Sequence, residues 1–159
     1  MKITNNQSYN NYNPQFGARL GWRATYELKN APAKLAEISQ KLKNMGEPTT
    51  IVDIMSQDTK KGRMYSLRLF NEIFGDKYNI SLLKDNHNKD VVSSSAKDFI
   101  RSLENITKTT VENKEYIIFN KIRNEHSGSY PLIKYLKGVI SRARENGKYL
   151  SPEAEQTFF

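Results

Sequence analysis

The chain has 159 residues, a formal net charge of +8 and no cysteine. This length suits one domain with its own hydrophobic core, and the lack of cysteine excludes disulfides, thiolate nucleophiles and thiolate metal sites. No segment is long and apolar enough to span a membrane, and the polar N-terminus lacks the apolar stretch of a conventional secretory signal. We therefore expect a soluble, cytoplasmic protein, with signal-independent export as the open alternative.

The positive charge has two explanations. It fits an acidic partner, such as nucleic acid or an anionic membrane surface. It also fits the amino-acid usage of an AT-rich, bacterial-type genome, because Lys, Asn, Ile and Tyr are abundant and Lys outnumbers Arg. We favour the second explanation, since proteins that bind phosphates often rely on the planar guanidinium of Arg.

Composition divides the chain into three parts. Residues 1–16 are polar and lack periodicity, so we expect a flexible arm with too little apolar surface to order itself. Residues 17–150 form the expected single domain, and residues 151–159 form a short C-terminal tail.

Residues 18–28 alternate strictly between two sets of side chains. The even-numbered set is apolar and includes Leu20 and Trp22, whereas the odd-numbered set includes Arg19 and Arg23. A period of two over this length is typical of a strand with one buried face. We therefore predict a first strand over 18–28, with its tryptophan in the core.

Helical spacing and turn residues predict the next four elements. A helix is expected over 32–45, because Pro32 suits its first turn and Gly46 follows its end. Alternating runs separated by turns at Gly62 and Gly75 indicate an antiparallel meander. The three strands of the meander are expected at 49–56, 63–74 and 78–83.

The C-terminal half of the domain is predicted to be helical. Thr109 and Glu112 have the spacing of a capping box, which favours a helix up to Asn124, although residues 115–120 also suit a buried strand. Further helices are expected at 96–106 and 131–146. The predicted fold is α+β, with element order β-α-β-β-β-α-α-α. It has a mostly antiparallel four-stranded sheet, and helices pack on one of its faces. The alternation and the helical spacing predict a shared core of Leu20, Trp22, Leu35, Ile38, Tyr65, Leu67, Leu69, Phe99, Leu103, Leu136 and Val139.

No motif in the chain predicts catalysis. His87 and His126 lie in polar segments and are too few for a histidine zinc site. Ser127 and Ser129 follow His126, but the nucleophile-elbow pattern Gly-x-Ser-x-Gly is absent. Asp53 alternates with apolar residues on a predicted strand, so we expect it at the surface. The sequence therefore predicts no catalytic residue, no metal site and no cofactor.

Electrostatics provide the one positive signal of a binding site. The apolar residues of the predicted helix at 131–146 fall on one face, and several cations fall together on a flank of the other face. Such a ridge suits contact with phosphates. The residues with this candidate role are Lys134, Lys137, Arg144 and Lys148, together with Arg19 and Arg23 of the first strand.

Three functions remain in contention at this stage. The first is a non-enzymatic interaction module with a protein partner, motivated by the aromatic-rich strands and the lack of catalytic motifs. The alternative is a nucleic-acid-binding domain that uses the basic ridge. The third is an enzyme of unknown type that uses carboxylates and tyrosines. The sequence makes no prediction of oligomeric state.

Overall fold

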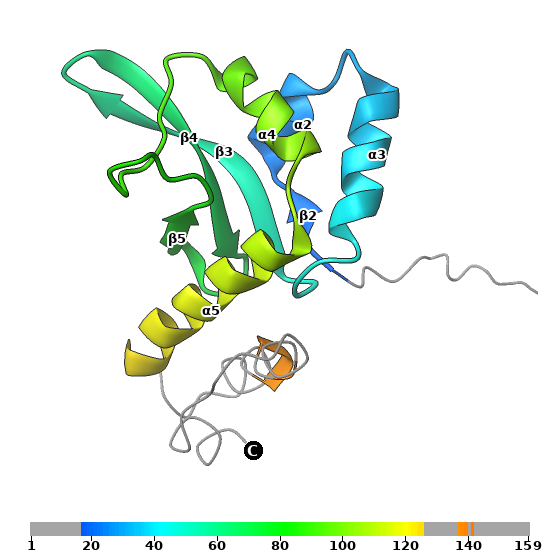
Figure 1. Ribbon diagram of the computed structural model, residues 1–159, viewed down its shortest axis with the longest axis vertical. Helices are drawn as coiled ribbons and strands as arrows, with labels where there is room; N and C mark the ends of the chain where they lie inside the picture. The colour runs from blue at the N-terminus through cyan, green and yellow to red at the C-terminus, as the bar shows by residue number, and fades with distance from the viewer. Residues whose placement is uncertain (1–16, 126–136, 140, 142–159) are drawn as a thin grey trace, which may run out of the picture.

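The sheet at the centre of the fold has four strands in the order β2-β3-β4-β5 (Figure 1). The structure, a computed structural model, describes residues 17–125, 137–139 and 141. The predicted arm at 1–16, the tail at 151–159 and most of the predicted last helix lie outside these residues. The described chain has a mixed α+β fold.

The strands pair in both directions. The short β2, Arg19–Leu20, runs parallel to β3, Thr50–Thr59. The next strand, β4, Gly62–Asn71, is antiparallel both to β3 and to β5, Gly75–Ser81. Two of the three pairings are therefore antiparallel, but the β2–β3 pairing makes the sheet mixed.

The prediction of a strand over 18–28 is wrong. Only β2 is extended, and the chain then forms the helix α2, Trp22–Glu27. Its even-numbered residues satisfy helical i, i+4 spacing as well as strand alternation. Ala24 is therefore buried, whereas Trp22, which we placed in the core, is 70% exposed.

The other predicted helices are present with adjusted ends. The helix α3, Pro32–Leu42, confirms the one expected over 32–45. The segment expected as one helix over 96–106 consists of a 3-10 turn, η1, Ala96–Phe99, followed by the helix α4, Ile100–Glu104.

The helix α5, Lys108–Glu125, resolves the ambiguity at 115–120 in favour of helix. Its N-terminus differs from the predicted capping box at Thr109. The Thr107 hydroxyl instead accepts a hydrogen bond from the Thr110 backbone N–H at 3.2 Å, so Thr107 is the cap. In Figure 1, α5 crosses the lower end of the sheet, far from α2.

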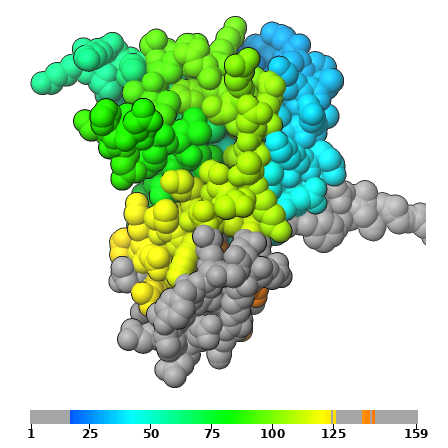
Figure 2. All heavy atoms as spheres, in the orientation of Figure 1, coloured from blue at the N-terminus to red at the C-terminus, as the bar shows by residue number. Residues whose placement is uncertain are grey.

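Glycines close both predicted hairpin turns. Gly62 has a φ of 104° between β3 and β4, and Gly75 has a φ of 79° at the start of β5. Residues with a side chain rarely adopt these angles, so the glycines explain why the meander turns at these points. The β3–β4 turn projects from the body of the molecule (Figure 2).

One hydrophobic core joins the sheet to the helices. Alternate residues of β3 and β4 are buried together with side chains from α3, α4 and α5. Leu20, Leu35 and Tyr65 were predicted to be core residues but are only partly buried, and Leu136 lies outside the described residues. The predicted core residues that are buried are Ile38, Leu67, Leu69, Phe99, Leu103 and Val139.

Part of the predicted last helix lies among the described residues. Residues 137–139 and 141, which belong to the predicted last helix, are helical, and Val139 is buried. Across the described part of the chain, every helix is too short or too polar to cross a membrane.

Candidate functional site

The exposed side of α2 carries two stacked aromatic rings. Trp22 is 70% exposed and Tyr26 is 46% exposed. Their ring centroids lie 5.7 Å apart, and the ring planes differ by 18°. The two residues are one helical turn apart, so the helix itself brings the rings together. Ala24 and Leu28 occupy the opposite side and are buried, which leaves the aromatic pair facing solvent.

Two cations lie over these rings. The Arg23 guanidinium is 5.2 Å from the centroid of Trp22 and 5.7 Å from that of Tyr65. The Lys29 ammonium is 3.9 Å from the centroid of Tyr26. At these distances the ring quadrupole attracts a cation. We name the group of Trp22, Arg23, Tyr26, Lys29 and Tyr65 the α2 surface.

A carboxylate on the sheet holds the start of α2 in place. The Asp53 Oδ1 atom accepts hydrogen bonds from the backbone N–H groups of Ala24 and Ile54, each at 2.8 Å. Helix N-termini leave such N–H groups without a partner inside the helix, and an Asp oxygen satisfies one of them. Asp53 is therefore a half-buried cap, rather than the fully exposed residue that we expected.

Gly21 makes the change from strand to helix possible. Its N–H donates to the Val52 carbonyl at 2.8 Å, which continues the pairing of β2 with β3. A Cβ at this position would lie 2.3 Å from the carboxyl carbon of Asp53. Only a glycine leaves room for the capping carboxylate, so residues 21 and 53 together fix the position of the α2 surface.

Tyr65 is held in place by its backbone and by its neighbours. It exchanges two backbone hydrogen bonds with Ser93, at 2.7 and 2.9 Å. Nearby, Arg63 and Asp58 form an exposed ion pair of 3.1 Å. The hydrogen bond that Arg63 donates to the Asp58 carboxylate raises the pKa of Arg63, and Tyr65 adds to this effect. Tyr65 is therefore fixed by its bonds to Ser93, and the neighbouring Arg63 is neutralised by Asp58.

Of the six predicted phosphate-contacting residues, three lie among the described residues, namely Arg19, Arg23 and Lys137, so the predicted phosphate site stays a prediction. Arg19 makes an ion pair with Glu72, and its guanidinium is therefore neutralised. Arg23 belongs to the α2 surface instead. Lys137 is exposed on a helical segment. Lys134, Arg144 and Lys148 lie outside the described residues.

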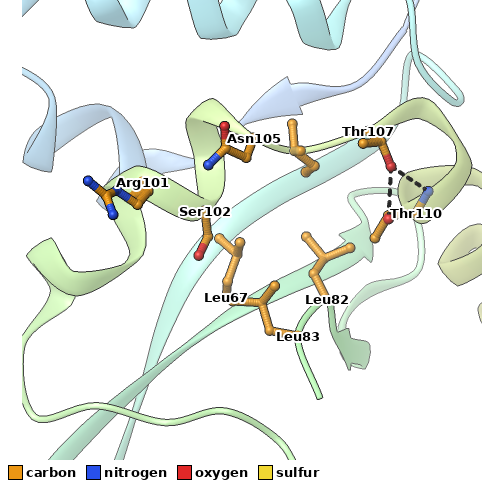
Figure 3. A pocket seen from close by; sticks show the side chains of 9 residues that line it. Leu67, Leu82, Leu83, Arg101, Ser102, Asn105, Thr107 and Thr110 are labelled. Carbon is orange, nitrogen blue, oxygen red and sulfur yellow. Dashed lines mark hydrogen bonds between the residues drawn. The ribbon is translucent and has the colours of Figure 1, made fainter. Parts of the chain in front are cut away.

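A hollow of about 300 Å³ lies between the sheet, α4 and the start of α5 (Figure 3). Its floor includes Leu67, Leu82 and Leu83, and the Thr107 and Thr110 hydroxyls at one wall bond to each other at 2.9 Å. Arg101 is the one ionisable residue in its lining. An Arg stays protonated, so this hollow has no group for acid–base catalysis.

Two other hollows also lack a paired acid and base in their linings. One, of about 330 Å³, lies on the β3–β4–β5 face beside Arg68, whose guanidinium donates to Ser66, Asn79 and Asp90. The other, of about 260 Å³, has Arg19 and Lys43 as its ionisable lining residues. These three hollows contain no carboxylate, imidazole or phenol in their linings, so they supply no acid–base pair.

Two buried carboxylates have structural partners. Glu112 accepts a hydrogen bond from the Gly46 N–H at 3.1 Å. Glu115 accepts one from the Glu47 N–H at 2.7 Å and another from the Thr50 hydroxyl. These bonds attach α5 to the turn before β3.

Metal ligands do not gather within the described ranges, where no three His, Cys, Asp or Glu side chains are grouped to hold an ion. His87 is exposed in a loop, and its backbone N–H donates to Asp85. His126, Ser127 and Ser129 lie beyond those ranges.

Comparisons with family models, with curated proteins and with solved structures gave no match to this chain. The α2 surface therefore has to be interpreted from its own chemistry. Sequence reasoning missed this surface, although Gly21 in the middle of an alternating run was a usable sign that the strand ends there.

Proposed function

We propose that this protein is a non-enzymatic interaction module and that the α2 surface docks a protein partner. The observation that carries the proposal is the stacked pair of Trp22 and Tyr26, held in the open on a capped helix. Trp, Tyr and Arg are the residues that most often dominate the binding energy of protein interfaces. All three stand together on this surface.

The order of the α2 surface supports the proposal. Each ring stacks on the other, a cation lies over each, and Asp53 caps the helix that carries them. Groups that are already held in their bound arrangement lose little conformational entropy on binding. The surface is therefore suited to docking without a large rearrangement.

Nucleic-acid binding is the second candidate. Aromatic rings beside cations also form platforms on which unpaired bases stack. At α2, however, the ring faces already stack on each other and lie under Arg23 and Lys29. A base would have to displace one of these contacts, so we rank this candidate below a protein partner.

The proposal is tested by removing the aromatic pair. Trp22→Ala and Tyr26→Ala should each abolish capture of the proteins that the unchanged chain retains from its source cells, as measured by quantitative mass spectrometry. Because both side chains are exposed, each change should cost less than about 1 kcal/mol of stability. Ile73→Ala is the matched control, since Ile73 is 51% exposed at the β4–β5 turn. Unchanged capture by both aromatic variants would overturn the proposal.

A further inference from the structure

We infer that the partner docked by the α2 surface presents an acidic peptide segment, with Asp or Glu side chains next to apolar ones. This inference rests on the proposed function and names the chemistry of the partner. It starts from the two cations of the surface, Arg23 and Lys29. Within the described residues, neither cation makes an ion pair with a carboxylate.

Two cations close in sequence to this surface are already neutralised. Arg19 pairs with Glu72, and Arg63 pairs with Asp58. Arg23 and Lys29 have aromatic partners in place of carboxylates. The free positive charge next to the exposed rings is thus concentrated on these two residues, and it complements an anionic ligand.

The surroundings of Arg23 favour a carboxylate as the group that it binds. The residue is half-buried, and its guanidinium lies close to the rings of Trp22 and Tyr65. A guanidinium can bind a carboxylate through two parallel hydrogen bonds. The rings of Trp22 and Tyr65 lie beside such a pair, and the exposed part of Trp22 offers contact to an apolar side chain of the same segment.

The number of cations argues against a nucleic acid as the ligand. Nucleic-acid affinity grows with the number of phosphates that a protein neutralises. The α2 surface supplies two free cations, and Asp58 of β3 neutralises Arg63, two residues before Tyr65. Two ion pairs beside an apolar contact match a short acidic peptide better than a phosphate chain.

The test uses the fluorescence of Trp22, the one tryptophan of the chain. The full chain is titrated with a synthetic peptide in which Glu alternates with Leu, and with matched peptides that carry Lys or Ser in place of Glu. We expect the Glu peptide to bind best, to shield Trp22 from acrylamide quenching, and to bind more weakly as salt is raised. The double variant Arg23→Glu with Lys29→Glu should weaken binding on the order of tenfold or more.

Lys108→Glu with Lys121→Glu is the matched control, because both lysines are exposed on α5 and the change in net charge is the same. We expect the control to retain most of the affinity. Equal weakening by both double variants would show that only the net charge of the chain attracts the peptide, which would overturn the inference.

Other outcomes separate the inference from the proposed function. If the Ser peptide binds as well as the Glu peptide and Trp22→Ala abolishes both, measured by titration calorimetry because this variant lacks the fluorophore, the docking surface stands and the acidic partner is wrong. If single-stranded RNA binds in place of the Glu peptide and depends on Trp22, Arg23 and Lys29, both the acidic partner and the protein partner are wrong. Self-association that Trp22→Ala abolishes, without peptide binding, would identify a second copy of the chain as the occupant and would overturn the inference.

Discussion

Asp90 shows how a single carboxylate organises the charges around it. It accepts a hydrogen bond from Arg68 at 2.5 Å and another from Lys84 at 2.6 Å. The bond from Lys84 is the main cause that lowers the pKa of Asp90. Lys114 interacts electrostatically with both Lys84 and Asp90. Partial burial and the charge of Lys84 lower the pKa of Lys114, whereas Asp90 opposes this effect. The carboxylate therefore balances three cations.

Replacing this carboxylate should destabilise the fold in a pH-dependent way. Asp90→Asn should cost about 1 kcal/mol at neutral pH, because it leaves Arg68, Lys84 and Lys114 close together without an anion. The folded-state pKa of Asp90 lies below its unfolded value of 3.8, so its stabilisation is complete above pH 3.8 and is lost as the pH falls through the folded value. Urea unfolding at several pH values measures this difference.

Asp76→Asn is the control for that measurement, since Asp76 is exposed in β5. It should change stability little at any pH. A difference between the wild type and Asp90→Asn that stays constant down to strongly acidic pH would contradict the charge-balancing role of Asp90.

At the level of elements, α2 depends on a residue distant in sequence. The helix has only six residues, and its own N-cap, Gly21, has no side chain that could accept a hydrogen bond. Short helices in water are marginal without tertiary support. The capping oxygen of Asp53 supplies that support from β3.

Asp53→Ala should therefore loosen α2. We expect a loss of about 1–2 kcal/mol, the usual cost of removing a helix cap. The Trp22–Tyr26 stack should also become less ordered, which near-ultraviolet circular dichroism of Trp22 can detect. Asp53→Asn keeps an acceptor oxygen at the same place and should stay close to the wild type in both measurements. Equal loss in both variants would show that the charge, rather than the cap, matters.

The elements that follow α2 were predictable because their signals are local. Pro32 begins α3, and the glycines at 62 and 75 adopt the positive φ values that hairpin turns require. The α2 segment was not predictable in the same way, since its alternation indicates a strand, whereas on a helix the same residues divide into two opposite pairs, Trp22 with Tyr26 and Ala24 with Leu28. The helix is also capped by Asp53, a contact across 29 positions of the chain that local periodicity does not reveal. Because the helix α2 was not predicted, the α2 surface was not predicted either.

On the scale of the whole molecule, buried carboxylates join α5 to the turn before β3. Glu112 and Glu115 of α5 reach the turn at residues 46–47, before β3, and bind its backbone N–H groups. Gly46 adopts a φ of 65° there, and a Cβ on it would lie 2.4 Å from the Glu115 carboxylate. Burying a carboxylate costs free energy unless hydrogen bonds compensate. Here the bonds from the backbone N–H groups and from the Thr50 hydroxyl provide that compensation. Local periodicity did not predict it, because the partners are more than 60 positions apart.

Glu115→Ala should accordingly be among the more damaging changes in the chain. It leaves the Glu47 N–H and the Thr50 hydroxyl without their acceptor in a buried place, and each lost bond to a charged group costs about 1.5–3 kcal/mol. We expect a total loss of at least about 3 kcal/mol, measured by urea unfolding with an unchanged m-value.

Glu125→Ala is the matched control, because Glu125 is exposed on the same helix and accepts one 3.2 Å bond from Tyr78. It should cost less than about 1 kcal/mol. Similar losses from both changes would mean that α5 is held to the sheet by its apolar face alone, through Val111, Ile118 and Ile122, and that the carboxylates add nothing.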